Sequence, residues 1–387
     1  MLTTGPSDEP DTRRALRAAT VELLARRLPT HEATRTDVDG TFDRSLWRVL
    51  GNAGLLGLDA AEEVGGSGGS VGDAVAVTEE LARVLPSLSV DYVLSGMGMR
   101  MLKNPGSGMV ASWLPAVASG EMLCSFGLSE PDNGTDLLGL RTRAEIVDGS
   151  WRVQGQKTWI SLAGEADVIF ILCRTDPSEV HRSRGISLIA VPTDQPGVTT
   201  RRVKLAGMRA AMTYEVFLDD AIAPEENIVG VRGEGLQIIS STLDVERVMA
   251  AAISLGIGRA ALDLHVSYAK QRHAFGRPIG ALQAIQHPAA DSVAELCAAR
   301  ALIESAVRMI ERGADAQAQS AMAKLVAAET TARVVDRGMR AMGAMGLADE
   351  SPMQMYFRDA RLQLFSPISN EMVRNLLAES LGLPRSY

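Results

Sequence analysis

Three charged residues lie close together at the start of residues 243–258, a segment that is otherwise apolar or small, with the sequence LDVERVMAAAISLGIG. They are Asp244, Glu246 and Arg247. Burial among apolar side chains raises the pKa of a carboxyl group, because it disfavours the charged form. Such a carboxylate can serve as a general acid or base. The alternative is a carboxylate that is exposed, or paired with a neighbouring arginine, and has no part in catalysis.

Four other stretches combine glycine with residue types that bind ligands. Residues 128–136 (LSEPDNGTD) form a polar loop, and residues 155–161 (GQKTWIS) place a tryptophan between hydroxyl residues in a strand. Residues 272–286 (RHAFGRPIGALQAIQ) end one helix and begin another, and residues 342–346 (MGAMG) allow a close approach of backbones. Taken singly, each has a structural explanation. A tryptophan in a strand usually packs in the core, and an arginine at a helix C-terminus usually meets the helix dipole.

The periodicity of the chain divides it into three regions that position these residues. From about residue 12 to residue 120, apolar residues recur at spacings of three and four, which predicts helices. Short alternating runs follow from about residue 122, and Asp148-Gly149 between two of them predicts a hairpin. The helical period returns near residue 235, where residues 236–272 predict one long helix and further helices begin near Leu282 and Ala314.

We therefore expect an α+β fold with an N-terminal helical domain (1–120), a middle antiparallel β-barrel or sandwich (121–233) and a C-terminal helical bundle (234–387). The length of 387 residues and the hydrophobic content of 46% suit a large core. A net charge of −8 argues against a nucleic-acid partner, and no long charge-free apolar run predicts a membrane span. Scattered cysteines and histidines argue against disulfides and metal sites, and the start lacks a secretory leader, so we expect a cytoplasmic protein.

The order of six stretches is more informative than any one of them. They are SFGLSEPDNGTD, GQKTWIS, LAGMRAAMTYEVFLDD, LDVER, QRHAFGRPIGALQAIQ and FRDAR. With these, the chain resembles the acyl-CoA dehydrogenase family of flavoproteins over essentially its whole length. The resemblance implies non-covalent FAD, a C-terminal four-helix domain and a homotetramer built as a dimer of dimers. It also implies α,β-dehydrogenation of an acyl thioester, carried by coenzyme A or an acyl carrier protein, with electrons passed to an electron-transferring flavoprotein.

The resemblance assigns the flavin ring to the middle domain. Leu128 and Ser129 match positions that meet the pyrimidine edge of the ring, and Trp159 matches the residue that covers one ring face. Ser161 matches a residue that reaches the N5 region, and Thr135 matches a position near the pantetheine arm of the substrate. A flat ring with polar edges needs an apolar wall and a few placed donors, which these residue types can supply.

The other end of FAD is assigned to the C-terminal domain of a neighbouring subunit. Arg272 and Phe275 match the residues that hold the pyrophosphate and adenosine, Gln283 matches a further FAD ligand, and Gly343 lies in the loop that meets the adenine. A guanidinium suits a diphosphate because it is always charged and bidentate. The family usually has Gln-x-x-Gly-Gly in that loop, whereas this chain has Arg340 and an alanine after Gly343. Either the backbone keeps the contact or Arg340 binds phosphate itself.

The usual catalytic base is absent. Most members carry it as the glutamate of a Glu-Gly-Thr turn after the Arg-Asp-Ala motif, and here Pro367, Ile368 and Ser369 stand at those three positions. The isovaleryl and long-chain types carry the base on the long helix instead, at the position of Glu246. The resemblance therefore makes Glu246 the expected base.

Two further consequences follow from the family pattern. Asp244 and Arg247 match positions near the nucleotide-bearing arm of the substrate. The position of Pro367 normally gives its backbone N–H to the thioester oxygen, beside a ribityl hydroxyl of FAD, and proline has no N–H. The substrate carbonyl must then lie differently, or use the N–H of Ile368, or belong to something other than a standard thioester. An oxidase or flavin-dependent monooxygenase on the same fold, and a weakly catalytic partner subunit of a hetero-oligomeric dehydrogenase, remain as alternatives.

Overall fold

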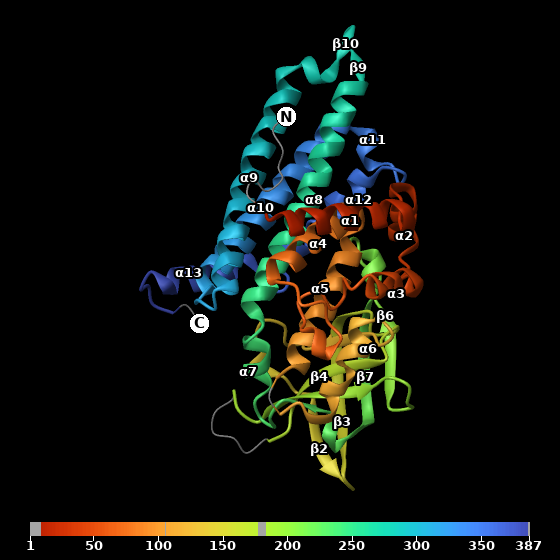
Figure 1. The fold of residues 1–387 in the computed structure, drawn as a ribbon, viewed down its shortest axis with the longest axis vertical. Coiled ribbons are helices and arrows are strands. Elements are labelled where there is room, and N and C mark those ends of the chain that lie inside the picture. The colour runs from red at the N-terminus through yellow and green to blue at the C-terminus, as the bar shows by residue number, and fades with distance from the viewer. Residues whose placement is uncertain (1–8, 105, 177–182, 386–387) are drawn as a thin grey trace.

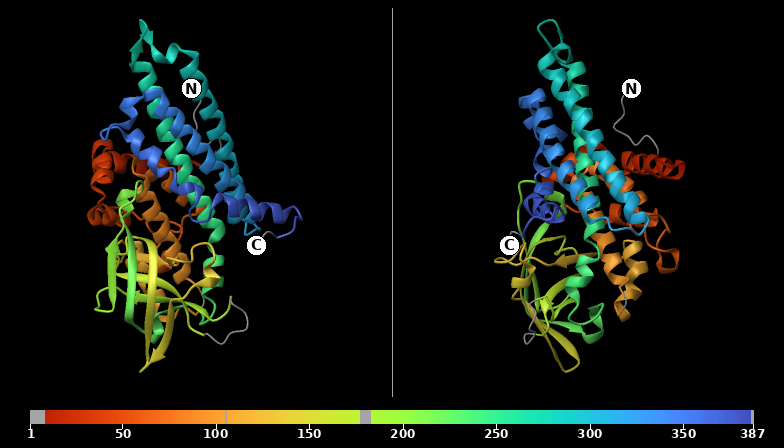
Figure 2. Two further views of the ribbon diagram at one scale, coloured as in Figure 1. Left: turned by 180° about the vertical axis from the view of Figure 1, so that it is seen from behind. Right: turned by 90° about the vertical axis from the view of Figure 1, so that its left-hand side faces the viewer.

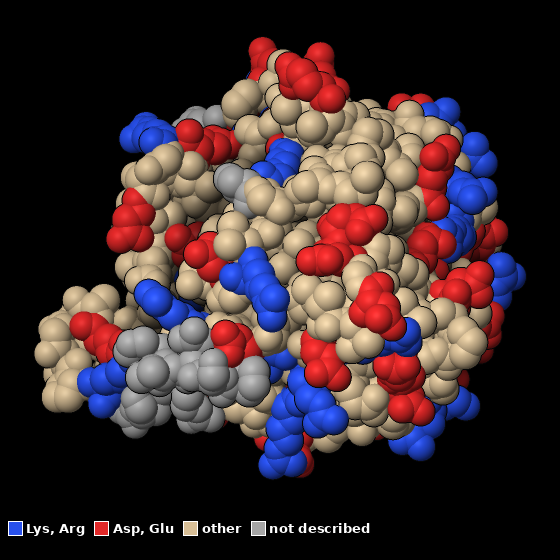
Figure 3. Space-filling view, turned by 90° about the horizontal axis from the view of Figure 1, so that it is seen from below, with Lys and Arg blue, Asp and Glu red and all other residues tan. Residues whose placement is uncertain are grey.

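The computed structural model describes residues 9–104, 106–176 and 183–385. Long helices of the C-terminal region form one end of an elongated molecule, and the β-sheet forms the other (Figure 1). The N-terminal helices lie between and beside them, and two further views show the same arrangement (Figure 2). The face seen from the sheet end mixes acidic and basic side chains among uncharged ones (Figure 3).

The N-terminal helices begin where the sequence supplies helix starts. Ser70 and Asp73 form a reciprocal capping box at the start of α4, and Pro86 occupies the first turn of α5. The glycine-rich residues 54–70 before α4 contain only one short 3₁₀ turn, at Glu62–Val64. The helices are α1 (Asp11–Arg27), α2 (Thr30–Asp39), α3 (Arg44–Asn52), α4 (Val71–Val84), α5 (Pro86–Leu102) and α6 (Leu114–Ala118).

The middle region folds into one sheet in the order β6-β7-β3-β2-β4-β5-β8, with β1 beside β4. The hairpin predicted at Asp148-Gly149 is present between β2 and β3, and both turn residues have positive φ. Most pairings are antiparallel, but β4 runs parallel to β1 and, at one position, to β2. The strands are β1 (Cys124–Gly127), β2 (Arg143–Val147), β3 (Ser150–Ser161), β4 (Val168–Arg174), β5 (Ile186–Pro192), β6 (Val198–Arg202), β7 (Thr213–Pro224) and β8 (Ile228–Val229).

The C-terminal region is helical, but the single long helix expected over residues 236–272 is wrong. The structure divides it at Ser241 and Thr242, whose hydroxyl groups donate to the carbonyl groups of Ile238 and Ile239. Such local bonds offer the backbone an alternative to continuing the helix. The helices are α7 (Gly235–Ser240), α8 (Leu243–Gln271), α9 (Gln283–Glu311), α10 (Gln317–Met342), α11 (Ala344–Leu347), α12 (Pro352–Asp359) and α13 (Asn370–Ser380).

Helix α8 is the central helix of the molecule. Its length and composition would suit a membrane span, yet 83% of its most apolar window is buried inside the protein. Gly256 lies against the backbone of Glu79 on α4, and Gly258 lies against Leu296 and Thr331 on α9 and α10. Packing on several sides therefore accounts for the apolar composition of α8.

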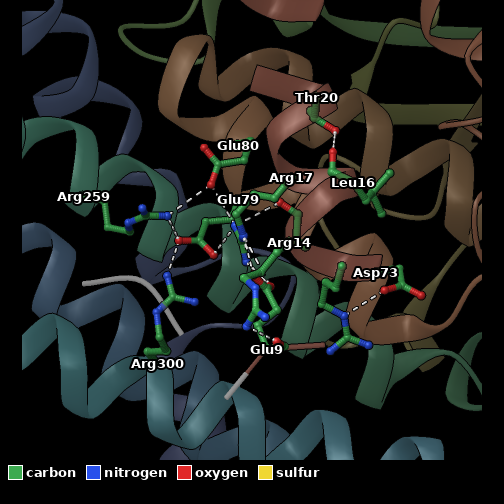
Figure 4. A network of polar contacts seen from close by, with 12 residues as sticks. Glu9, Arg14, Leu16, Arg17, Thr20, Asp73, Glu79, Glu80, Arg259 and Arg300 are labelled. Carbon is green, nitrogen blue, oxygen red and sulfur yellow. Dashed lines mark hydrogen bonds and ion pairs between the residues drawn. The ribbon is translucent and has the colours of Figure 1, made fainter. Parts of the chain in front are cut away.

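A buried ion cluster fixes α8 to the N-terminal domain (Figure 4). Glu79 of α4 is 1% exposed and forms ion pairs with Arg17 of α1, Arg259 of α8 and Arg300 of α9. Despite its burial, the three guanidinium groups hold the pKa of the Glu79 carboxyl well below its usual range. Four helices from both ends of the chain thus meet at one carboxylate.

Candidate active site

The loop after β1 is held along strand β3 by three hydrogen bonds. The backbone N–H of Thr158 donates to the carbonyl of Ser129 at 3.0 Å. The ammonium group of Lys157 is fully buried and donates to the carbonyl of Leu128 at 3.1 Å and to Glu130 at 2.9 Å. Leu128 and Ser129 are therefore fixed next to the strand that carries the tryptophan. Sequence reasoning missed Lys157, although a lysine in a strand of the GQKTWIS stretch was a visible signal.

Trp159 is presented to solvent and does not pack in the core. Its φ of 63° is left-handed, and the pairing of β3 with β7 is irregular between Lys157 and Ile160. This bulge turns the indole outward, so that Trp159 is 61% exposed. It borders an open hollow of about 520 Å³, whose lining is Pro131, Thr158, Trp159, Arg201, Arg202, Val203, Lys204 and Glu215. The core explanation for this tryptophan is wrong.

Ser161 lies at the end of the same strand, beside β1. Its carbonyl accepts a hydrogen bond from the hydroxyl of Ser125, and its strand partner is Thr213. The next residue, Leu162, donates its N–H to the carbonyl of Met212 at 3.0 Å. Thr135 lies exposed in the loop before β2. The structure thus places Ser161 next to β1, the strand from which Leu128 and Ser129 follow directly.

The carboxyl group of Glu246 has no partner among the described residues. It lies in the first turn of α8, where its N–H donates to the carbonyl of Thr242 at 3.0 Å. Its carboxyl group forms no hydrogen bond or ion pair with any residue that the structure describes. Burial raises the pKa of Glu246 to about 7, against an opposing effect of Arg247. The interpretation of Glu246 as the ion-pair partner of an arginine is therefore wrong.

Arg247 pairs with Asp244 instead. Its Nη1 donates to Oδ1 of Asp244 at 2.9 Å, and the hydroxyl of Ser320 on α10 donates to the same oxygen at 3.0 Å. Arg247 is 4% exposed, and its Nε has no hydrogen-bond partner among the described residues. A buried guanidinium with an unused donor can bind an acceptor that is not part of the chain.

Helix α10 brings the turn at Pro367 to the same region. One helical turn after Ser320, the fully buried Lys324 donates to the carbonyl of Ile368 at 2.6 Å and to Oδ1 of Asn370 at 2.7 Å. Burial lowers the pKa of Lys324 to about 8. Pro367 is exposed, and the N–H of Ile368 has no partner within the described chain. Sequence reasoning missed Lys324, whose signal is a lysine inside the small and apolar run SAMAKLVAA.

Arg272, Phe275 and Gln283 lie far from this region. Arg272 follows the end of α8, and Phe275 is in the hairpin of β9 (His273–Ala274) and β10 (Arg277–Pro278) that leads to Gln283 at the start of α9. The hairpin is at the opposite end of the molecule from the sheet (Figure 1). Phe275 is 91% exposed. Within one chain, these residues do not meet Trp159.

The loop after α10 is also open. Gly343 has a φ of 57°, and the space where a Cβ would stand contains no atom within 4 Å. Arg340 is exposed and its Nε forms an ion pair with Asp336 at 2.7 Å. Both residues are accessible to a group from outside the chain, but the guanidinium of Arg340 already has an acidic neighbour.

Comparison with known proteins places this geometry in a family. The chain matches three family profiles in succession: the acyl-CoA dehydrogenase N-terminal domain over residues 10–121, the middle domain over residues 125–221 and the C-terminal domain over residues 233–382. The chain belongs to the acyl-CoA dehydrogenase family. Members of this family are FAD-dependent oxidoreductases that act on CH–CH donors, and so is this protein.

The relatives and solved structures cover nearly the whole chain. The chain is 33% identical to a mitochondrial short-chain specific acyl-CoA dehydrogenase of Rattus norvegicus, over 98% of this chain and 91% of the relative. It is 34% identical to the acyl-CoA dehydrogenase FadE12 of Mycobacterium tuberculosis, over 88% and 89%. A glutaryl-coenzyme A dehydrogenase in complex with glutaryl-CoA superposes with a TM-score of 0.92 at 30% identity, over 99% and 98%. Butyryl-CoA dehydrogenase from Megasphaera elsdenii gives 0.92 at 28% identity, over 98% and 100%.

The described residues fit the cofactor of the family. An outward-facing indole, the hydroxyl groups of Ser129 and Ser161, and a loop backbone fixed by Lys157 supply an apolar wall with polar edges. That combination suits a flat ring with hydrogen-bonding rims. The exposed Arg272 suits a diphosphate, provided that a second chain brings the two halves together.

Proposed function

We propose that this protein dehydrogenates an acyl thioester between its α and β carbon atoms, with Glu246 as the base. The carboxyl group of Glu246 is the observation that carries the proposal, because the residue is partly buried and its carboxyl group has no partner in the described chain. Its pKa of about 7 suits a group that must accept a proton near neutral pH. The α C–H bond breaks, its proton passes to Glu246, and its electron pair forms the new double bond as the β-hydrogen leaves as hydride.

Bound FAD supplies the acceptor for that hydride. Leu128 and Ser129 would hold the pyrimidine edge of the ring, Trp159 would cover one face, and Ser161 would lie near N5. Thr135 would contact the pantetheine arm of the substrate. The outward-facing indole of Trp159 and the fixed backbone of Leu128 support these roles.

The thioester oxygen needs a donor that Pro367 lacks. We favour the N–H of Ile368, which has no partner within the described chain. Lys324 binds the carbonyl of Ile368 and so fixes the orientation of the turn. A placed donor to a developing oxyanion is worth roughly 3–4 kcal/mol of barrier. The unused Nε of Arg247, paired on its other side with Asp244, supports a role for these two residues along the nucleotide-bearing arm.

The complete FAD site would be shared between subunits of a homotetramer built as a dimer of dimers. The exposure of Phe275 at the end opposite the sheet supports this arrangement. Arg272, Gln283, Gly343 and Arg340 would then contact the pyrophosphate and adenosine of the FAD whose ring is held by the neighbouring chain. We further propose coenzyme A as the thiol carrier, an electron-transferring flavoprotein as the electron acceptor, and a cytoplasmic location.

The test is anaerobic reduction of the purified flavoprotein by short, branched, cyclic and aromatic acyl thioesters, each on coenzyme A and on a carrier protein. We expect one class to bleach the flavin of the wild type and Glu246→Gln to slow this step by at least about 100-fold. Glu350→Gln, which changes an exposed glutamate, is the matched control. Bleaching of Glu246→Gln at the wild-type rate would remove Glu246 from the role.

The missing N–H at Pro367 also favours a second candidate, an oxidase or monooxygenase. Its reduced flavin would react rapidly with air, whereas the dehydrogenase would require a protein acceptor. Stopped-flow mixing of the reduced enzyme with oxygenated buffer separates the two. Rapid reoxidation with a hydroperoxide absorbance would replace our first proposal.

A further inference from the structure

Asp244 and Glu246 lie on opposite sides of α8. Successive residues of a helix are rotated by about 100°, so these two side chains point roughly 200° apart. Arg247 is adjacent to both around the helix, but its Nη1 turns to Asp244, at 2.9 Å from Oδ1. The guanidinium is thereby drawn to the face that points away from Glu246.

A second helix holds Asp244 in that position. The hydroxyl of Ser320 on α10 is 3.0 Å from Oδ1 of Asp244, and Ser320 is fully buried. The same hydroxyl is 3.0 Å from the carbonyl of Gln317, so its single hydrogen is shared between two acceptors. Ser320 therefore helps to hold Asp244 beside Arg247, but its shared hydrogen bond stabilises that position less than the ion pair does.

Arg247 is the charged group that acts on Glu246. Burial raises the pKa of Glu246, and among the described charges the guanidinium of Arg247 opposes this effect. The positive charge of Lys324 on α10 interacts instead with the carboxylates of Glu329 on α10 and Glu371 on α13. The acidic residues of α4 are engaged by the arginine cluster of Figure 4. Among the described charges, this guanidinium is therefore the one whose position matters for the pKa of Glu246, in opposition to the larger effect of burial.

We propose that Asp244 is a positioning residue for Glu246: by holding Arg247 on the opposite face of α8, with the help of Ser320, it sets how tightly Glu246 holds a proton. This inference rests on the proposed role of Glu246 as base. The negative charge of Asp244 and the displacement of Arg247 act in the same direction, since both favour the protonated form of Glu246. Removing Asp244 leaves a buried guanidinium that turns to the nearest remaining carboxylate.

The proposal predicts shifts of opposite sign for the two partners of one ion pair. We expect Asp244→Asn to lower the pKa of Glu246 by about one unit and Arg247→Gln to raise it by about one unit. Ser320→Ala should lower it by less, and Asp244→Glu, which keeps the charge, should stay near the wild type. Asp220→Asn, which breaks an exposed pair with Arg152 in the middle domain, should cause no shift.

Two readouts keep the proposal separate from the function on which it rests. The first is an infrared pH titration of the protonated carboxyl band of the flavoprotein, assigned to Glu246 by its loss in Glu246→Gln. The second is the pH dependence of anaerobic flavin reduction by the best thioester. Both should move together in each variant, since a general base must be deprotonated before it can act.

Shifts of the same sign in Asp244→Asn and Arg247→Gln, or no shift in either, would overturn the proposal. If Asp244→Asn does not fold, Ser320→Ala and Arg247→Gln still give the two opposite directions. If the infrared band shifts as expected while Glu246→Gln reduces its flavin normally, the positioning role of Asp244 stands and the base assignment fails.

Discussion

At the scale of single residues, the environment of Glu246 has a consequence for stability as well as for chemistry. Burial raises the pKa of its carboxyl group to about 7 in the folded protein, from an ordinary value of 4.5 in the unfolded chain. The folded state therefore holds the proton more tightly, and stability falls as the pH rises from about 4.5 through about 7. Below that window both states are protonated, and the residue contributes no pH dependence.

Glu246→Gln removes this loss. We expect the difference in unfolding free energy between Glu246→Gln and the wild type to be roughly 1–3 kcal/mol more favourable to the variant at pH 8 than at pH 4.5, because the amide does not titrate. Urea unfolding of both proteins at the two pH values measures the difference. Glu350→Gln should show no such change, and an identical pH dependence of the wild type and Glu246→Gln would contradict the buried environment.

At the scale of elements, the contact of α8 with α4 depends on a residue without a side chain. A Cβ at Gly256 would overlap the backbone carbonyl of Glu79, whereas a Cβ at Gly96 of α5 would meet no atom within 4 Å. We expect Gly256→Ala to destabilise the protein by about 1–3 kcal/mol through overpacking. Gly96→Ala should stabilise it by about 0.5–1 kcal/mol, since alanine is the better helix former. Thermal unfolding of the two variants distinguishes these effects, and equal changes would refute the close packing.

The turn after α12 depends on a lysine of α10. Lys324→Met would leave the carbonyl of Ile368 and the side chain of Asn370 without their donor. We expect a weaker hold on the substrate carbonyl, seen as a lower kcat with retained FAD, and a loss of about 1–3 kcal/mol of stability. Steady-state kinetics and the flavin absorbance of the purified variant provide the measurement. Unchanged kcat would remove the turn from the oxyanion role.

The sequence predicts some of these elements and not others for physical reasons. The hairpin at Asp148-Gly149 follows from local turn chemistry. The residues proposed for the flavin ring come from two separate stretches, residues 128–136 and 155–161, and rest on the resemblance to the family. The hold of Lys324 on Ile368 joins residues 44 positions apart and leaves no periodic trace. The break before α8 depends on the hydrogen bond from the hydroxyl of Thr242 to the carbonyl of Ile239, and hydrophobic periodicity does not predict such a bond.

At the scale of the whole molecule, the separation of Arg272 from Ser161 predicts that neither chain alone holds FAD fully. Arg272→Gln and a Ser129→Ala/Ser161→Ala double variant should each retain less FAD than the wild type. Arg272→Gln keeps the residues that would hold the flavin ring, and the double variant keeps Arg272. Co-expression of the two should therefore restore a fraction of complete sites, each built from one chain of each variant. Flavin content per chain of the mixed oligomer measures this, and no recovery above the two parents would contradict a shared site.

The cluster around Glu79 limits how the chain can be dissected. One of its cations comes from the first helix, and the other two come from helices that follow the sheet. A fragment that lacks α1 would keep a buried carboxylate with fewer counter-charges, and an isolated C-terminal fragment would bury two guanidinium groups with none. We therefore expect the N-terminal and C-terminal helical regions to unfold together in one cooperative transition. A protease that removes the first helix should then unfold both regions and cause the loss of bound FAD.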